Sequence, residues 1–451
     1  MANAMSHTPS LGWAPSTALR PCVSISLVIA YSLYMLSSPR RYRLKHLAVI
    51  FLLSADYFQH LHDLYPDDHV NQAFAHGVLI HLLHMVHVVV VRRDDGYITT
   101  TSIPPDHSSA EGSRLLSKTN LSPSYRAYKM VFNFRGIGTS WQAIPTQHRL
   151  FPAQQQNGNG RNLNLSHQYT SQGQQDSYAC DVLSRRWDDL LHRLFSILCR
   201  YLAAAIYYEI TEPRIHIWSQ ALVLGQAQPF SSSLLSPTEM TARAYFTLHF
   251  MFHQWLLLSS FHECLSIICI YILRLDDPHE WPPLFGNIFA ACTVRGFWAN
   301  YWHRLVYAPF RALADALSAQ VWGRKNNVAR RLVNNALVFL LSGVLHSIID
   351  WERGLCNPSA SGIFYALQPV GFIVESLVQY YVWGPIRRRL LSLSRGTNTA
   401  VPAPLVVFET ILGYGWVWIW FYWLVPYCII SELRCNSARM KALKVEHKQV
   451  L

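Results

Sequence analysis

Residues 332–349 read LVNNALVFLLSGVLHSII and carry no charged side chain. A run of about 20 predominantly apolar residues crosses the hydrocarbon core of a bilayer as a helix, so this stretch predicts a membrane span. His346 lies inside it, and an ionisable residue inside a span is a functional hypothesis by default because its burial is costly. We expect its imidazole to be neutral and able to accept a proton. A histidine hydrogen-bonded between helices for packing alone is an equally good interpretation of this position.

The composition of the whole chain also indicates a membrane protein. Of its 451 residues, 51% are hydrophobic and 14% are charged, whereas a typical soluble domain has roughly 25% charged residues. Mean hydropathy is +0.11 although one long stretch is polar. Disordered and collagen-like chains are excluded, because 15 Trp and 21 Phe side chains need apolar surroundings.

The formal net charge is +12 and the isoelectric point lies near 9.3. In a membrane protein, such an excess reflects Lys and Arg in cytoplasmic loops that face anionic lipid. We expect no nucleic-acid partner, because no motif interleaves basic and aromatic residues as RNA-binding modules do. The nine Cys residues are scattered without a CxxC pair, so the sequence predicts neither a disulfide framework nor a zinc site.

Eight apolar segments predict an all-α, polytopic bundle of about eight or nine transmembrane helices. One of them, residues 242–273, is too long for a simple crossing and predicts either a tilted helix or two shorter ones. The candidate spans are Cys22–Ser38, His46–His60, Ala73–Val91, Leu190–Ile210, Ala242–Leu273, Leu332–Ile349, Gly362–Trp383 and Leu405–Ile430.

This pattern divides the chain into three regions. Residues 1–91 hold the N-terminal spans, and residues 188–451 form the main membrane core. Between them, residues 92–187 form a polar, partly disordered cytoplasmic loop with the low-complexity piece 154–164. Within the core, Pro278–Arg331 mixes aromatic and basic residues, which is typical of an amphipathic helix at the membrane interface.

The charged residues between spans predict the topology. Arg40–Lys45 marks the first loop as cytoplasmic, and the acidic stretch Asp63–Asp68 marks the next as lumenal. Cytoplasmic and lumenal loops then alternate along the chain. The further cytoplasmic segments are the long polar loop, Arg324–Arg331 and Arg387–Arg389. The basic tail Arg434–Lys448 breaks the pattern, because it would be lumenal. Either the last apolar run does not cross once, or an earlier span is miscounted.

A second group of polar residues lies in Phe297–His303, which reads FWANYWH. On a helix, Asn300 and His303 are three residues apart and share a face beside aromatic side chains. The alternative is an aromatic belt at the membrane surface, where Trp and Tyr are common.

Two further motifs contain prolines or glycines. The sequence WPPLFG at 281–286 predicts a fixed turn. The sequence RGIG at 135–138, followed by Trp141 and Gln142, places a guanidinium beside two glycines, and such a combination can bind phosphate.

The remaining histidines suggest a competing function. His81, His84 and His87 are spaced by three on one predicted helix, and His249 and His253 form an HxxxH pair. Membrane di-iron oxygenases use His-rich motifs, and imidazole suits iron. Such enzymes require HxxHH-type boxes, and the chain has no HisHis dipeptide, so the number of ligands falls short. We expect no metal site, and we expect these histidines to line helix contacts or a polar cavity.

Taken in order, four motifs resemble those of wax synthase-like proteins, which belong to the membrane-bound O-acyltransferase superfamily. The motifs are RGIG at 135–138, WPPLFG at 281–286, VRGFWANYWH at 294–303 and SGVLH at 342–346. The likeness is greatest to fungal members that acetylate terpenoid and meroterpenoid metabolites. One departure is visible, since Gly296 stands where the family commonly has an acidic residue, and this removes an ion-pair partner for Arg295.

The resemblance implies an integral, multi-pass O-acetyltransferase of the endoplasmic reticulum. Its co-substrates would be acetyl-CoA and a lipophilic terpenoid alcohol, with no bound cofactor. His346 would be the catalytic base, His303 and Asn300 the polar groups beside it, and Arg135 and Arg295 the donor-binding residues. A long-chain wax-ester synthase is the main alternative, ahead of a di-iron oxygenase or a transporter. A transporter is expected to contain inverted repeats, and none is found. The oligomeric state is left open.

Overall fold

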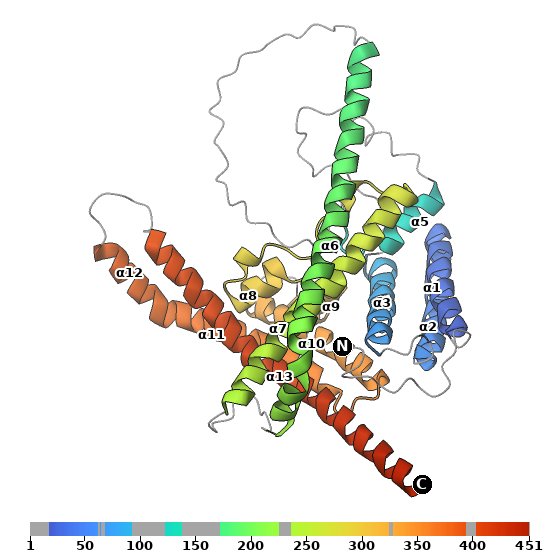
Figure 1. Ribbon diagram of the computed structural model, residues 1–451. Coiled ribbons are helices and arrows are strands. Elements are labelled where there is room, and N and C mark those ends of the chain that lie inside the picture. The colour runs from blue at the N-terminus through green and yellow to red at the C-terminus, as the bar shows by residue number, and fades with distance from the viewer. Residues whose placement is uncertain are drawn as a thin grey trace.

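The computed structural model shows an all-helical bundle (Figure 1). It describes residues 18–61, 64, 68–92, 122–137, 172–224, 236–323, 328–393 and 403–450. Among these residues, no β-strand occurs and seven helices are long and apolar enough to cross a membrane. The predicted all-α, polytopic fold is therefore confirmed, and the protein is an integral membrane protein.

The α-helices lie close to the predicted spans. They are α1 (Leu19–Ser37), α2 (Arg43–Gln59), α3 (Asp68–Val86), α5 (Pro123–Phe132), α6 (Gln172–Leu224), α7 (Pro237–Ile267), α8 (Val294–Gly296), α9 (Tyr307–Trp322), α10 (Val328–Glu352), α11 (Ser359–Val378), α12 (Gly384–Leu393) and α13 (Ala403–Val450). Short 3₁₀ turns and π-helical turns join them: η1 (Arg40–Tyr42), η3 (His87–Arg92), η6 (Ile268–Ile272), η7 (Pro278–Glu280), η8 (Ile288–Ala290), η9 (Phe297–Tyr301) and η10 (Gln379–Trp383).

Two details of the predicted spans are resolved by these bounds. The long segment 242–273 is one helix, because α7 continues without a break into the π-helical turn η6. The predicted span at 46–60 corresponds to α2, which has 17 residues and is shorter than the seven spanning helices. It packs along α1 as a helical hairpin.

The amphipathic helix α5 joins the N-terminal helices to the loop that precedes the candidate site. Its apolar side packs on α1 through Ala127 and Val131. On its other side, Lys129 pairs with Asp276 and with Glu280, the latter at 2.6 Å. Burial lowers the pKa of Lys129, but the two carboxylates raise it by more, so the net shift is upward. This clamp fixes the start of the 276–286 loop.

The largest buried cluster of the core is aromatic. It brings α11 and α13 together with the loop and turns that run from residue 284 to residue 302. At its centre, Phe297 of η9 lies 4.7 Å from Phe421 of α13, centroid to centroid. Buried Gln368 of α11 accepts hydrogen bonds from the indoles of Trp298 at 3.0 Å and Trp420 at 3.1 Å. The aromatic segment is therefore held inside the bundle and is not only a surface belt.

Two ion pairs at the ends of α13 determine how this helix runs. Near its start, Glu409 pairs with Arg387 of α12 at 2.7 Å. Near the end of its apolar part, Glu432 pairs with Arg353, just after α10, at 2.8 Å. Since Arg387 and Arg353 lie at opposite ends of α11, the apolar part of α13 runs the length of α11. This arrangement favours a single crossing by the last apolar run, and an earlier miscounted span is then the preferred explanation for the basic tail.

The turn between α10 and α11 contains Cys356, which is disulfide-bonded. The sequence provides no reason to expect a disulfide here, because it predicts no disulfide framework. By contrast, Cys22, Cys199, Cys264, Cys269, Cys292 and Cys428 are free thiols. Disulfides persist in oxidising compartments such as the lumen of the endoplasmic reticulum. This agrees with the lumenal side that the basic loops predict for the turn.

A single crossing of α13 predicts that the segment after Arg434 lies on the lumenal side, despite its basic charge. In sealed microsomes, we expect an epitope tag after Leu451 to resist external protease. A tag inserted at residues 394–402, next to the basic cluster Arg387–Arg389, should be cleaved. Cleavage of both tags before detergent is added would contradict this topology.

Candidate active site

The candidate base, His346, lies on the face of α10 that meets α11 and α3. Its ring stacks on Tyr365 of α11, with centroids 4.4 Å apart and planes inclined by 16°. The two helices approach closely because glycines face each other: a Cβ on Gly343 would lie 2.9 Å from the carbonyl oxygen of Gly362. The SGVLH motif therefore supplies both the histidine and the small residue that lets Tyr365 reach it.

His76 of α3 is the hydrogen-bond partner of His346, and it is a residue that the sequence analysis missed. Its Nε2 lies 3.2 Å from Nδ1 of His346, and its Nδ1 lies 2.8 Å from the backbone carbonyl oxygen of Gln72. The two helices pack through apolar neighbours of these rings, including Ala75 and Leu345. Two intramembrane histidines from distant parts of the chain therefore meet.

The tautomer of each ring follows from these contacts. A carbonyl oxygen can only accept, so Nδ1 of His76 carries the proton in its bond to Gln72. In the neutral ring, Nε2 of His76 is then an acceptor, and Nδ1 of His346 must donate to it. The lone pair of His346 is therefore on Nε2, the nitrogen that faces away from His76. This is the state that a general base requires.

His303 is the third histidine of the group. Its ring is packed between aromatic side chains, with centroids 5.8 Å from Phe285 and 5.5 Å from Trp302. Burial, then the charges of His76 and Arg135, lower the pKa of His303 to about 4. Its buried Nδ1 has no hydrogen-bond partner. Buried polar atoms are normally paired, so this nitrogen is free to meet a polar atom of a substrate.

The local structure around Asn300 differs from the expected helix. A π-helical turn, η9, ends at Tyr301, and Trp302 is extended with ψ 148°. The prediction that Asn300 and His303 share a helical face is therefore wrong, because His303 lies outside the helix. Asn300 is half-buried in the turn before it. Its role beside the reacting centre stays a prediction.

A buried carboxylate, Glu375 of α11, anchors the start of this segment. Its Oε1 accepts a short hydrogen bond from the backbone N–H of Val294 and one of 2.9 Å from the indole of Trp416. Its Oε2 lies 3.4 Å from the backbone nitrogen of Arg295. Unsatisfied N–H groups at a helix start favour a negative charge. Sequence reasoning could not pair Glu375 with this segment, because the two are far apart in the chain.

The two arginines proposed for donor binding lie in different surroundings. Arg295 is exposed, and its Nη2 donates to Ser376 at 3.2 Å. Arg135 is buried and donates to the carbonyl oxygens of Pro282 at 2.6 Å and Pro283 at 2.9 Å. Burial lowers the pKa of Arg135 to about 10. In this conformation, Arg135 holds the WPPLFG turn, and its contact with a phosphate stays a prediction. Gly138, Trp141 and Gln142 lie outside the described residues.

The histidines that suggested an iron site have other partners. His81 lies 2.9 Å from the hydroxyl of Ser32, and His84 lies 2.7 Å from the carbonyl oxygen of Met130. His249 and His253 stack on each other with centroids 5.4 Å apart. Within the described part of the chain, no three His, Cys, Asp or Glu residues are grouped to hold a metal ion. The di-iron alternative is not favoured.

Residues 281–367 match the sequence profile described as "Membrane bound O-acyl transferase family". This range holds the WPPLFG turn, His303 and His346, and its match agrees with the resemblance carried by the four motifs. This part of the chain is therefore similar to the membrane bound O-acyl transferase family. The similarity supports the predicted acyltransferase class, in which an acyl group passes from a donor to an acceptor.

Several curated relatives of the chain are fungal proteins named as acetyltransferases. The chain is 26% identical over 318 residues to acetyltransferase nanB of Aspergillus nanangensis, covering 68% of this chain and 67% of nanB. It is 25% identical over 316 residues to acetyltransferase TRI7 of Fusarium sporotrichioides, covering 69% and 64%. It is 36% identical over 156 residues to acetyltransferase ataH of Aspergillus terreus, covering 34% and 47%. The match thus spans less than two thirds of TRI7 and of ataH. No solved structure matches the chain.

Gly296, the position where the family commonly has an acidic residue, has no room for a side chain. A Cβ there would lie 2.6 Å from the carbonyl oxygen of Ala290 and 2.8 Å from Oγ1 of Thr293. We expect Gly296→Asp to destabilise the protein by about 1–3 kcal/mol through overpacking. The measurement is thermal unfolding in detergent.

The matched control is Gly415→Ala, because a Cβ at Gly415 meets nothing within 4 Å. We expect this variant to melt within about a degree of the wild type, as an unstrained surface substitution would. If the two variants melt at the same temperature, the close contacts around Gly296 do not exist.

Proposed function

We propose that the protein is a membrane O-acetyltransferase. It transfers the acetyl group of acetyl-CoA to a hydroxyl of a lipophilic terpenoid or meroterpenoid at the membrane of the endoplasmic reticulum. The observation that carries this proposal is the orientation of His346, whose Nε2 keeps its lone pair because Nδ1 donates to His76. Together with the similarity to an O-acyl transferase family, this base points to direct transfer to an alcohol.

In the proposed reaction, Nε2 of His346 removes the proton of the hydroxyl as its oxygen attacks the thioester carbonyl. His303 or Asn300 donates a hydrogen bond to the oxyanion that forms on the carbonyl oxygen. Collapse of this intermediate breaks the carbon–sulfur bond, and the proton passes from His346 to the CoA thiolate. The products are the acetyl ester and CoA. General-base catalysis contributes about 10²–10⁴-fold, and an oxyanion donor about 10²–10³-fold.

The surface next to His346 supports a lipophilic acceptor. A groove of 460 Å³ runs between α10 and α11, lined by small and apolar residues that include Gly343, Ser347 and Gly362. Its rim includes the exposed side chains of Ile348 and Trp351, which face the membrane phase. His346 does not line this groove, but it precedes Ser347 on α10, so an alcohol seated in the groove lies beside the helix that carries the base.

The donor is assigned from the relatives and from charge. The relatives are named as acetyltransferases, which favours acetyl-CoA over a longer acyl-CoA. Arg295 is exposed in the segment that carries His303 and offers a guanidinium to the anionic donor. We propose that Arg295 contacts the donor directly. Arg135 acts on the donor indirectly, through the WPPLFG loop that it holds.

Replacement of the two paired histidines tests the assignment of roles. We expect His346→Ala to lower kcat at least about 10²-fold, because the base is lost. His76→Ala should lower kcat less, and His76→Asn should restore part of the loss because an amide oxygen also accepts from Nδ1 of His346. The assay measures ester formation in microsomes at matched protein levels.

The control is His81→Ala, since His81 lies on the same helix and bonds to Ser32. This variant should keep activity within about twofold of the wild type. Wild-type activity in His346→Ala would show that His346 is not the base. Equal losses in His76→Ala and His81→Ala would show that His76 has only a packing role.

The choice of acyl chain is tested with a panel of labelled acyl-CoAs and terpenoid alcohols. We expect acetyl-CoA to be used at least about tenfold more efficiently than palmitoyl-CoA, because the donor site is predicted to fit a two-carbon chain. Products are identified by mass spectrometry. A preference for palmitoyl-CoA with a fatty alcohol would support the wax-ester synthase instead.

A further inference from the structure

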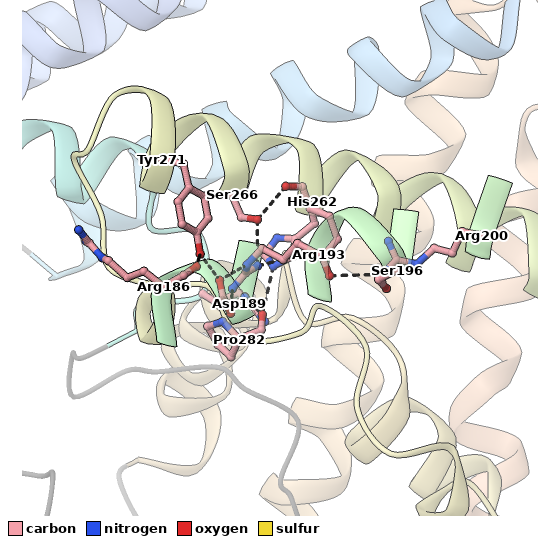
Figure 2. A network of polar contacts seen from close by, with 11 residues as sticks. Arg186, Asp189, Arg193, Ser196, Arg200, His262, Ser266, Tyr271 and Pro282 are labelled. Carbon is pink, nitrogen blue, oxygen red and sulfur yellow. Dashed lines mark hydrogen bonds and ion pairs between the residues drawn. The ribbon is translucent and has the colours of Figure 1, made fainter. Parts of the chain in front are cut away.

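A polar network joins the part of α6 between Arg186 and Arg200 to α7 (Figure 2). Arg193 of α6 donates to Asp189 at 2.7 Å, to Glu263 of α7 at 3.0 Å and to Ser266 at 2.9 Å. Tyr271 donates to Asp189 at 2.5 Å. Arg193 is thus fully paired, and the network holds the two helices in register.

Arg200 lies further along α6 and is paired less completely. Its Nη2 donates to Ser196 at 2.6 Å and lies 3.3 Å from Glu263, while its guanidinium lies 5.8 Å from the ring centroid of Trp255. The residue is 8% exposed. Its buried Nη1 has no hydrogen-bond partner. Leaving a buried charged donor unpaired is costly, so this nitrogen indicates a missing acceptor.

The carboxylate partners of the network are shared. Arg193 and Arg200 share Glu263, and Arg193 also uses Asp189. The third guanidinium, that of Arg135, is bound by carbonyl oxygens only, according to its described contacts. The carboxylates of the neighbouring loop are paired with Lys129 and Arg186. Among the described contacts, Arg135 therefore has no carboxylate partner and Arg200 has only a shared one.

His262 of α7 connects these arginines with the candidate active site. All three guanidiniums lie close enough to His262 to interact with it electrostatically. Its Nε2 lies 3.1 Å from the carbonyl oxygen of Pro282, the same oxygen that accepts from Arg135. The WPPLFG turn is in turn bonded to the catalytic segment, because Gly286 N donates to the carbonyl oxygen of Tyr301 at 2.8 Å.

We propose that Arg200, with Arg193 and Arg135 beside it, binds a phosphate group of the CoA donor. A guanidinium binds phosphate through charge-assisted, often bidentate, hydrogen bonds, and Nη1 of Arg200 is the unpaired donor for it. Arg193 and Arg200 lie in the half of the predicted span Leu190–Ile210 that is nearer the predicted cytoplasmic loop, and the network connects through the WPPLFG turn to Tyr301, two residues before His303. This inference rests on the proposed function, because it takes the donor to be a CoA thioester.

The test compares CoA with pantetheine, which has the same thiol arm and no phosphate, as ligands of the full-length protein in detergent. We expect Arg200→Gln to weaken CoA binding at least about tenfold and to leave pantetheine binding unchanged. In kinetics, KM for acetyl-CoA should rise by a similar factor at nearly constant kcat, and KM for S-acetylpantetheine should not change. Dephospho-CoA shows which phosphate Arg200 binds.

The matched control is Arg214→Gln, since Arg214 is exposed on the same helix and bonds only to the carbonyl oxygen of Ile210 in the described structure. It should bind CoA as the wild type does. If Arg200→Gln weakens the binding of CoA and of pantetheine equally, the proposal is overturned. It is also overturned if the substitution changes binding only in vesicles that contain phosphatidic acid, because Arg200 would then bind a lipid phosphate. A wild type that binds CoA through Arg200 but transfers no acetyl group would refute the proposed function and leave this inference standing.

Discussion

The hydrogen bond between His76 and His346 is the interaction on which the candidate site depends. It joins residues separated by 270 positions in the sequence, one from the N-terminal spans and one from the family-matched core. In a bilayer, water does not compete for such a contact, so each polar group must find its partner within the protein. The pair therefore makes the N-terminal helices part of the candidate site, and it orients His346 through the carbonyl oxygen of Gln72.

The rest of the structure keeps this pair and His303 in place. Glu375 and Gln368 of α11 accept hydrogen bonds from the backbone or indoles of the aromatic segment, which would otherwise be unsatisfied. The close contact of Gly343 with Gly362 sets the distance between α10 and α11. On the opposite side, Arg135 and Lys129 hold the loop that leads into the segment. The proposed acceptor groove lies on α10 and α11, the helices that carry His346 and Tyr365, and the arginine network is linked to the aromatic segment through the WPPLFG turn.

The all-α fold could be predicted from the sequence because hydropathy alone reveals spans of the required length. His346 and His303 were also found from local patterns, one as an ionisable residue in a span and the other within a recognised motif. His76 is likewise an ionisable residue inside a predicted span. It does not share the three-residue spacing of His81, His84 and His87 on the same helix, and that spacing pointed to a metal site instead. Glu375 and Arg200 are also ionisable residues inside the predicted spans 362–383 and 190–210, but their roles, like that of Gln368, follow from partners that are distant in the sequence. The π-helical turn before His303 could not be predicted either, because the packing of Phe297 and Trp302 in the core determines its conformation.

The central claim is that His346 acts as a base in a single-step transfer and does not carry the acetyl group itself. The most direct measurement mixes purified protein with labelled acetyl-CoA in the absence of alcohol and follows both CoA release and labelling of the protein by rapid quench and mass spectrometry. Direct transfer predicts no stoichiometric burst of CoA and no acetyl group on His346 until the alcohol is added. A burst of one CoA per protein, with acetylated His346, would contradict the account.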